Sequence, residues 1–263
     1  MKKFLCIGLS VFIFLLLFGE NELIKKGDLC FERRNEFLDL REATKNINEA
    51  IEIYSGILDK NFDEIVFYKL VKAIDFKYSF LLDKEENKVE RVNYCKSLLE
   101  KIDNYCKMNK NEGISVYILY SKAILGKILI SSLDKKDSKL LLIDIAKKIK
   151  ESAEKLVLLD EKFESYVAYL VLGRLYYEAP KIVFILPWPN KYKSKEYLQR
   201  YLLHNPDSLV GLYFLADTLY SLGQKEEARK LYLKVAGSKV RENFYYEDKR
   251  IIEEVQNNIK NFY

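Results

Sequence analysis

Residues 209–236 read LVGLYFLADTLYSLGQKEEARKLYLKVA, and this stretch decides the fold. Apolar side chains recur at helical spacing before Gly223 and again after it. They are Leu212, Leu215, Ala216 and Leu219 in the first half, and Ala228, Leu231, Tyr232 and Val235 in the second. Because spacings of three and four residues put side chains on one helix face, the stretch predicts two amphipathic helices joined by a turn at Gly223.

Small residues stand where two such helices would cross. Ala216 and Ala228 would let the two backbones approach closely. This pattern resembles the tetratricopeptide repeat (TPR), a helix pair with a period of about 34 residues. TPR units stack into solenoids whose concave surfaces bind other molecules, so the resemblance implies a binding scaffold.

The pattern recurs upstream with less regularity. The expected first helices carry Leu23, Gly27 and Cys30; Phe67, Leu70, Val71 and Ile74; Tyr117, Tyr120, Ile124 and Ile128; and Tyr169, Leu172, Gly173 and Tyr176. Their expected partners span 46–58, 92–106 and 145–159 and, in the last pair, carry Ser194, Leu198, Tyr201 and Leu202. Insertions at 34–43, 82–90, 131–142 and 179–192 make these pairs irregular.

Residues 247–262 form a final amphipathic segment, with Ile251, Ile252, Val255 and Ile259 on one side and polar residues on the other. That distribution is typical of a helix that caps a repeat array. The sequence therefore predicts an all-α, TPR-like helical-hairpin solenoid of about four irregular helix pairs plus a C-terminal capping helix, spanning 22–263.

Residues 1–19 have a different composition. Lys2 and Lys3 precede an apolar run from 4 to 18, which ends at Gly19. This order is typical of a secretory signal peptide, and the run is shorter than the roughly 18 residues of a clear transmembrane helix. Because Leu17 is large for the position before a cleavage site, an uncleaved signal anchor is the alternative. We expect a periplasmic or cell-envelope protein that contacts the membrane only through this segment.

Charge and motif content argue against several classes of protein. The net charge is +5, with 44 basic and 39 acidic residues interspersed, so no nucleic-acid partner is expected. Nucleophile-elbow, P-loop and dinucleotide motifs are missing, which predicts no enzyme and no cofactor. The one histidine, His204, stands in an inter-repeat turn without ligand-spaced neighbours, so no metal site is expected. Cys30, Cys95 and Cys106 are interpreted as small core residues.

The loop 182–189 is the strongest candidate binding element. Two prolines bracket Trp188, the only tryptophan, and Phe184 lies earlier in the loop. Because proline stiffens the backbone, the loop would present a rigid aromatic group to a ligand or partner. The alternative is that the apolar loop folds back and plugs the solenoid.

Polar and aromatic residues on the first helices are further candidates. Tyr169 and Tyr176 occupy apolar repeat positions and are expected in the core. Tyr177, Tyr213 and Tyr220 lie off the main apolar stripe, where they would face a ligand. Arg174 stands one turn before Glu178, so its guanidinium is suited either to a ligand carboxylate or to a salt bridge with a neighbouring helix.

Several segments resemble the T-component family of TRAP-type (tripartite ATP-independent periplasmic) transporters. They are KGDL at 26–29 with NINEAIEIY at 46–54, AIDFKY at 73–78 with DKEE at 83–86, LGRLYYEAP at 172–180, and EDKR at 247–250. The segment 172–180 is the most specific, and together the segments span most of 22–262. Three features depart from the family: an apolar loop replaces a Gly-rich segment after Pro180, the middle region 140–150 diverges, and no cysteine is suited to lipid attachment.

The resemblance implies an exported, non-catalytic, TPR-like binding protein. Its implied partner is a periplasmic solute-binding protein, its implied ligand a small apolar or acidic solute, and some relatives form homo-trimers. The alternative is a general TPR scaffold for protein–protein interaction in the cell envelope.

Overall fold

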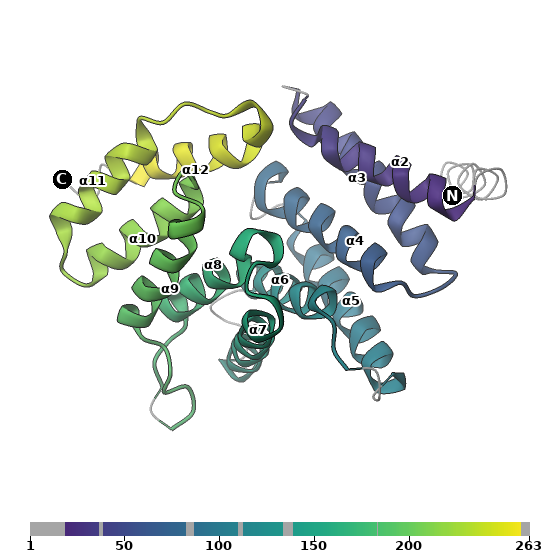
Figure 1. Cartoon of the computed structure of the whole chain (residues 1–263), viewed down its shortest axis with the longest axis horizontal. Coiled ribbons are helices and arrows are strands. Elements are labelled where there is room, and N and C mark those ends of the chain that lie inside the picture. Colours follow the sequence, from purple (N-terminus) through teal and green to yellow (C-terminus); the bar gives the residue numbers. More distant parts are fainter. Residues whose placement is uncertain are drawn as a thin grey trace. The chain divides into compact units, whose positions relative to one another are not determined.

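The computed structural model describes residues 19–36, 39–82, 87–109, 113–133, 139–182 and 184–258. These residues form eleven α-helices (Figure 1). The helices are α2 Glu20–Glu32, α3 Leu40–Leu58, α4 Glu64–Phe76, α5 Lys88–Met108, α6 Val116–Ser132, α7 Lys139–Asp160, α8 Phe163–Glu178, α9 Lys191–His204, α10 Leu209–Ser221, α11 Lys225–Ala236 and α12 Tyr245–Asn258. Short helical turns occupy Arg33–Asn35, Lys77–Leu81 and Glu242–Phe244.

Three of the segments on which the sequence makes predictions are not among these residues. The signal segment up to residue 18, the DKEE motif at 83–86 and the end of the capping helix at 259–263 lie outside the described residues. Among the residues the structure does describe, no helix combines the length and the apolar character that crossing a bilayer requires.

The chain divides into two compact units, 1–86 and 87–263. In the first unit, α2 packs against α3, α3 packs against α4, and α2 also contacts α4. The expected helix around Phe67 is α4, which packs on α3, whereas its expected partner at 92–106 is α5, which packs on α6 in the second unit.

The second unit shows the stacking that defines a solenoid. Its closest pairs are the hairpins α6/α7, α8/α9 and α10/α11. The first helices also contact one another in succession, α6 with α8, α8 with α10, and α10 with α12. With α2/α3 in the first unit, these hairpins and the cap α12 confirm the predicted all-α helical-hairpin fold.

Side-chain caps fix where many of these helices begin. The side chains of Asp63, Ser115 and Ser208 accept a hydrogen bond from a backbone N–H in the first turns of α4, α6 and α10, respectively. Asn190 accepts two such bonds at the start of α9. Each cap is worth about 1 kcal/mol, so the polar residue before each apolar stripe sets the helix register.

Glycines permit the turn and the close packing in the second unit. Gly223 has φ +81°, a left-handed conformation that glycine adopts without strain, and it joins α10 to α11. Gly173 on α8 allows Leu198 of α9 to lie directly against the helix backbone, because a Cβ atom there would be 2.5 Å from Leu198 Cγ. The α8/α9 pair is therefore closely apposed at a position where the sequence has no side chain.

The core runs along the inner faces of the helix pairs. In α6, buried apolar residues lie on all sides, because α5, α7 and α8 all pack against it. Cys30 and Cys95 are buried and Cys106 is half-buried, all three as free thiols. The interpretation as core residues is thus confirmed for Cys30 and Cys95.

Candidate functional site

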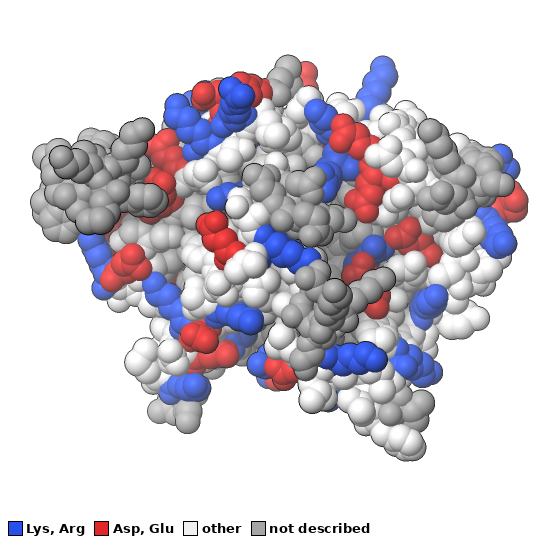
Figure 2. Space-filling model, turned by 180° about the vertical axis from the view of Figure 1, so that it is seen from behind, with Lys and Arg blue, Asp and Glu red and all other residues white. Residues whose placement is uncertain are grey.

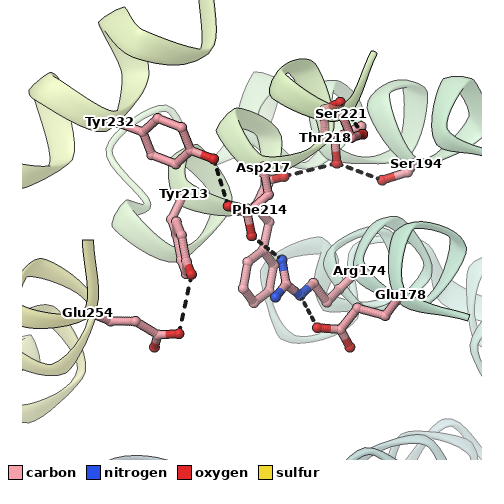
Figure 3. A network of polar contacts seen from close by, with 10 residues as sticks. All are labelled: Arg174, Glu178, Ser194, Tyr213, Phe214, Asp217, Thr218, Ser221, Tyr232 and Glu254. Carbon is pink, nitrogen blue, oxygen red and sulfur yellow. Dashed lines mark hydrogen bonds and ion pairs between the residues drawn. The ribbon is translucent and has the colours of Figure 1, made fainter. Parts of the chain in front are cut away.

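A chain of short polar contacts joins α8, α10 and α11 (Figure 3). Arg174 Nη1 donates to Asp217 Oδ2 at 2.5 Å, and its Nε lies 2.6 Å from Glu178 Oε1, one turn further along α8. The Tyr232 hydroxyl on α11 donates to Asp217 Oδ1 at 2.8 Å. We call Arg174, Glu178, Phe214, Asp217 and Tyr232 the Arg174 cluster.

Aromatic rings cover the guanidinium of this cluster. Arg174 Cζ lies 4.3 Å from the Phe214 ring centroid and 5.1 Å from that of Tyr177. Such cation–π contacts strengthen as water is excluded, and the Arg174 side chain is only 24% exposed whereas that of Glu178 is 53% exposed. The Arg174 cation is therefore largely buried, and the Glu178 carboxylate is presented to solvent.

The neighbouring carboxylates keep Arg174 positively charged. Burial disfavours the Arg174 cation, but the carboxylates of Glu178 and Asp217 outweigh it and raise the pKa of Arg174. Burial, together with the negative charge of Asp217, raises the pKa of Tyr232. The arginine thus stays cationic, and the tyrosine stays a neutral donor.

Two further contacts tie the surrounding helices together. The Tyr213 hydroxyl on α10 donates to Glu254 Oε1 on α12 at 3.2 Å (Figure 3). The buried hydroxyls of Ser194 on α9 and Thr218 on α10 lie 3.0 Å apart. Helices α8 to α12 are therefore linked by polar contacts that pass through α10.

The structure places the predicted tyrosines in different environments. Tyr169 and Tyr176 are buried, as expected. The expectation that Tyr213 lies off the apolar face is wrong, because its ring belongs to the core around α10 and only its hydroxyl reaches a polar partner. Tyr177 is half-buried beside Arg174, and Tyr220 is exposed near the end of α10, with Lys225 Nζ 5.8 Å from its ring centroid.

Of the two roles weighed for Arg174, the salt bridge to a neighbouring helix is the one present. Its partner Asp217 and the covering ring of Phe214 were not predicted from the sequence. A signal for Asp217 was available, because it is the one acidic residue among the apolar positions of 209–222. An isolated carboxylate on an otherwise apolar helix needs a buried partner.

The candidate loop 182–189 divides into two parts. Near its end, Leu186 and Pro189 are buried, and Trp188 packs on Tyr176 with ring centroids 5.0 Å apart. Lys150 Nζ on α7 lies 5.7 Å from the Trp188 ring. Phe184, in contrast, is 98% exposed. The end of the loop thus packs onto the core, with Trp188 held there rather than presented, while Phe184 projects. Val183 lies outside the described residues.

His204 is the last residue of α9 rather than part of the turn that follows. Its ring stacks on Tyr166, with centroids 3.7 Å apart and planes 8° from parallel. Tyr166 belongs to a short run of left-handed residues, 164–166, at the start of α8. Across the described residues, no three side chains of the kinds that bind metal ions come together.

The first unit holds a related polar cluster. The Tyr54 hydroxyl on α3 donates to Asp28 Oδ1 on α2 at 2.7 Å, and Lys69 on α4 donates to the other oxygen of the same carboxylate. Near it, burial, together with the charges of Arg34 and Lys69, lowers the pKa of Lys72 to about 8. The two clusters share one arrangement. In each, an aspartate on the first helix of a hairpin accepts a hydrogen bond from a tyrosine on the second helix. The same aspartate also pairs with a cation on a third helix.

No family model matches the chain, and no curated protein matches it. Its function is therefore inferred from its own residues.

Proposed function

We propose that this protein is a non-catalytic TPR-like binding protein that docks a protein partner along the first helices of residues 87–263. The observation that carries the proposal is the Arg174 cluster. It fixes α8 against α10 through a buried salt bridge and still presents Glu178, with half-buried Tyr177 beside it, to solvent. Rigid aromatic and charged groups on stacked first helices are what helical-repeat proteins use to hold partners.

A more specific form of the proposal is the T component of a TRAP-type transporter. In this form the protein is exported to the periplasm or cell envelope and docks a periplasmic solute-binding protein, with a small apolar or acidic solute as a further ligand. Support comes from the resemblance at 172–180, because this segment supplies Arg174, Tyr177 and Glu178. The segment that most resembles the family is thus also the one that builds the α8 side of the cluster.

The alternative is a general TPR scaffold that organises an envelope complex. It would use the same first-helix surface, since stacked hairpins present that surface whatever the partner. The two forms differ in the identity of the bound protein.

Native mass spectrometry of the full chain, purified gently from its own membrane and soluble fractions, tests the proposal. A co-purifying solute-binding protein supports the TRAP form, and unrelated envelope proteins support the general scaffold. A chain that is empty and monomeric in both fractions contradicts docking.

A matched pair of charge reversals tests the surface itself. Glu178→Arg changes an exposed carboxylate that pairs with Arg174 on first helix α8. Glu151→Arg changes an exposed carboxylate that pairs with Lys155 on second helix α7, also four residues apart. The Glu151–Lys155 pair is exposed at both ends and contributes little to stability. Arg174 is largely buried but keeps the Asp217 carboxylate in Glu178→Arg, so this variant should lose more stability than Glu151→Arg and still fold, as checked by circular dichroism. We expect Glu178→Arg alone to weaken partner binding at least tenfold; equal binding by both variants contradicts the proposed surface.

A further inference from the structure

The loop between α8 and α9 ends in an exposed apolar tip. Phe184 is 98% exposed and Ile185 is 47% exposed, and we call these two residues the apolar tip. The loop leaves the helices and projects from them, as Figure 1 shows below α9. Large apolar side chains in neighbouring exposed positions mark interaction sites more often than single ones do.

The base of the loop is built to hold the tip in place. Ile182 and Leu186 form an antiparallel bridge, with backbone N–H groups donating in both directions at 3.0 and 2.7 Å. Leu186 is fully buried and Trp188 packs on Tyr176, so the tip extends from an anchored base. At the tip, Phe184 has φ +67°, a conformation that bulky residues rarely adopt. A strained, exposed phenylalanine on a fixed base gives no packing benefit to the fold.

Lysines gather around the loop, although Glu178 and Glu196 flank it and Glu196 Oε2 lies 2.8 Å from Lys193 Nζ. Residues 179–195 contain four lysines and no acidic residue. Lys181, Lys191 and Lys193 are exposed, and exposed Tyr192 lies among them. Figure 2 shows the projection at the lower right as largely uncharged, with blue side chains beside it. An apolar tip beside lysines and a tyrosine matches the order of layers at a membrane surface, where acyl chains underlie anionic headgroups.

We propose that the apolar tip inserts into the headgroup region of an anionic lipid bilayer, while Lys181 and Lys191 contact the lipid phosphates. This interaction is separate from the proposed first-helix docking and does not depend on it. A protein partner is the less favoured occupant, because the tip is a single projection rather than a broad complementary surface.

The single tryptophan allows a local test. Trp188→Phe removes it and keeps an aromatic ring against Tyr176, and Phe184→Trp in that background places the tryptophan at the exposed tip. The full chain is mixed with vesicles of phosphatidylglycerol and phosphatidylcholine in equal parts, with brominated phosphatidylcholine as quencher. Local quenching is needed because vesicle flotation would also report on the predicted signal segment. Leu158→Trp in the same background is the control, because Leu158 is an exposed residue of α7.

We expect the tip tryptophan to shift its emission to the blue and to be quenched at least twofold on anionic vesicles, whereas the Leu158→Trp control stays unchanged. Each lysine near an anionic surface strengthens binding roughly fivefold, so Lys181→Ala should weaken vesicle partitioning by about that factor. Lys234→Ala, an exposed lysine on α11, should not. Two results would overturn the proposal. One is a tip tryptophan that is not quenched although the chains float with the vesicles. The other is equal quenching of the tip tryptophan on purely zwitterionic vesicles.

Discussion

Replacing Asp217 by alanine removes the carboxylate that joins α8, α10 and α11. The change removes the Asp217 Oδ1 acceptor from the buried Tyr232 hydroxyl, which costs about 2 kcal/mol. It also removes one of the two carboxylates paired with Arg174, which costs about 2 kcal/mol more because Glu178 remains. We therefore expect Asp217→Ala to lower the free energy of unfolding by about 4 kcal/mol.

A double-mutant cycle with Tyr232→Phe separates these contributions. Tyr232→Phe alone should cost about 2 kcal/mol, because it removes one hydrogen bond to a charged group. In the double variant the Tyr232 hydroxyl is itself absent, so the total cost should stay near 4 kcal/mol. The expected coupling energy between the two positions is therefore about 2 kcal/mol.

Urea unfolding followed by Trp188 fluorescence provides the measurement, because Trp188 lies in the same unit as the cluster. Ser221→Ala on α10 is the control, since its hydroxyl donates only within its own helix, to Thr218 O, and its loss should cost less than about 0.5 kcal/mol. Additive effects of Asp217→Ala and Tyr232→Phe would refute the shared hydrogen bond. An equal loss of unfolding free energy in Ser221→Ala would show that the effect of Asp217→Ala is not specific to the carboxylate.

Three further predictions concern other parts of the chain. Burial lowers the pKa of Lys72 to about 8 from its usual 10.5, with Arg34 and Lys69 adding to the effect, so the folded state binds its proton more weakly than the unfolded state. Lys72 should therefore contribute about 2 kcal/mol of stability that appears as the pH rises from 8 to 10, after allowance for partial exposure. Because burial raises the pKa of Cys30 and of Tyr54, which acts in the opposite sense, this contribution is measured as the difference between the wild type and Lys72→Met in calorimetric unfolding across that range. Phe184→Gly should be about 1 kcal/mol more stable than Phe184→Ala in urea unfolding, because only glycine relieves the positive φ; equal stabilities would argue against that conformation. Gly173→Ala should cost about 2 kcal/mol, because the new Cβ would meet Leu198 Cγ at 2.5 Å, whereas Gly19→Ala meets no atom within 4 Å and serves as the control in thermal unfolding.

The sequence alone was sufficient for the helices and for the hairpins α2/α3, α6/α7, α8/α9 and α10/α11, but it paired α4 with α5, which pack instead on α3 and α6. Residues 209–236 show why: the apolar spacing, Ser208 before it and Gly223 within it are all local signals, and each acts within one or two helical turns. The same local logic placed Tyr169 and Tyr176 in the core. It failed for Tyr213, because α10 is enclosed by α8, α9, α11 and α12, so its buried face is wider than one apolar stripe.

The composition of the candidate site was decided by the tertiary structure. Arg174 and Asp217 are 43 residues apart, and they meet only because α8 stacks on α10. The two parts of loop 182–189 also differ for a long-range reason, since Tyr176 and Lys150 hold Trp188 while nothing described in the structure covers Phe184. Helix formation depends on neighbours three and four residues away, whereas ion pairs and exposure depend on which helices lie side by side. The sequence therefore determined the repeating helices, and the stacking of those helices determined which side chains meet.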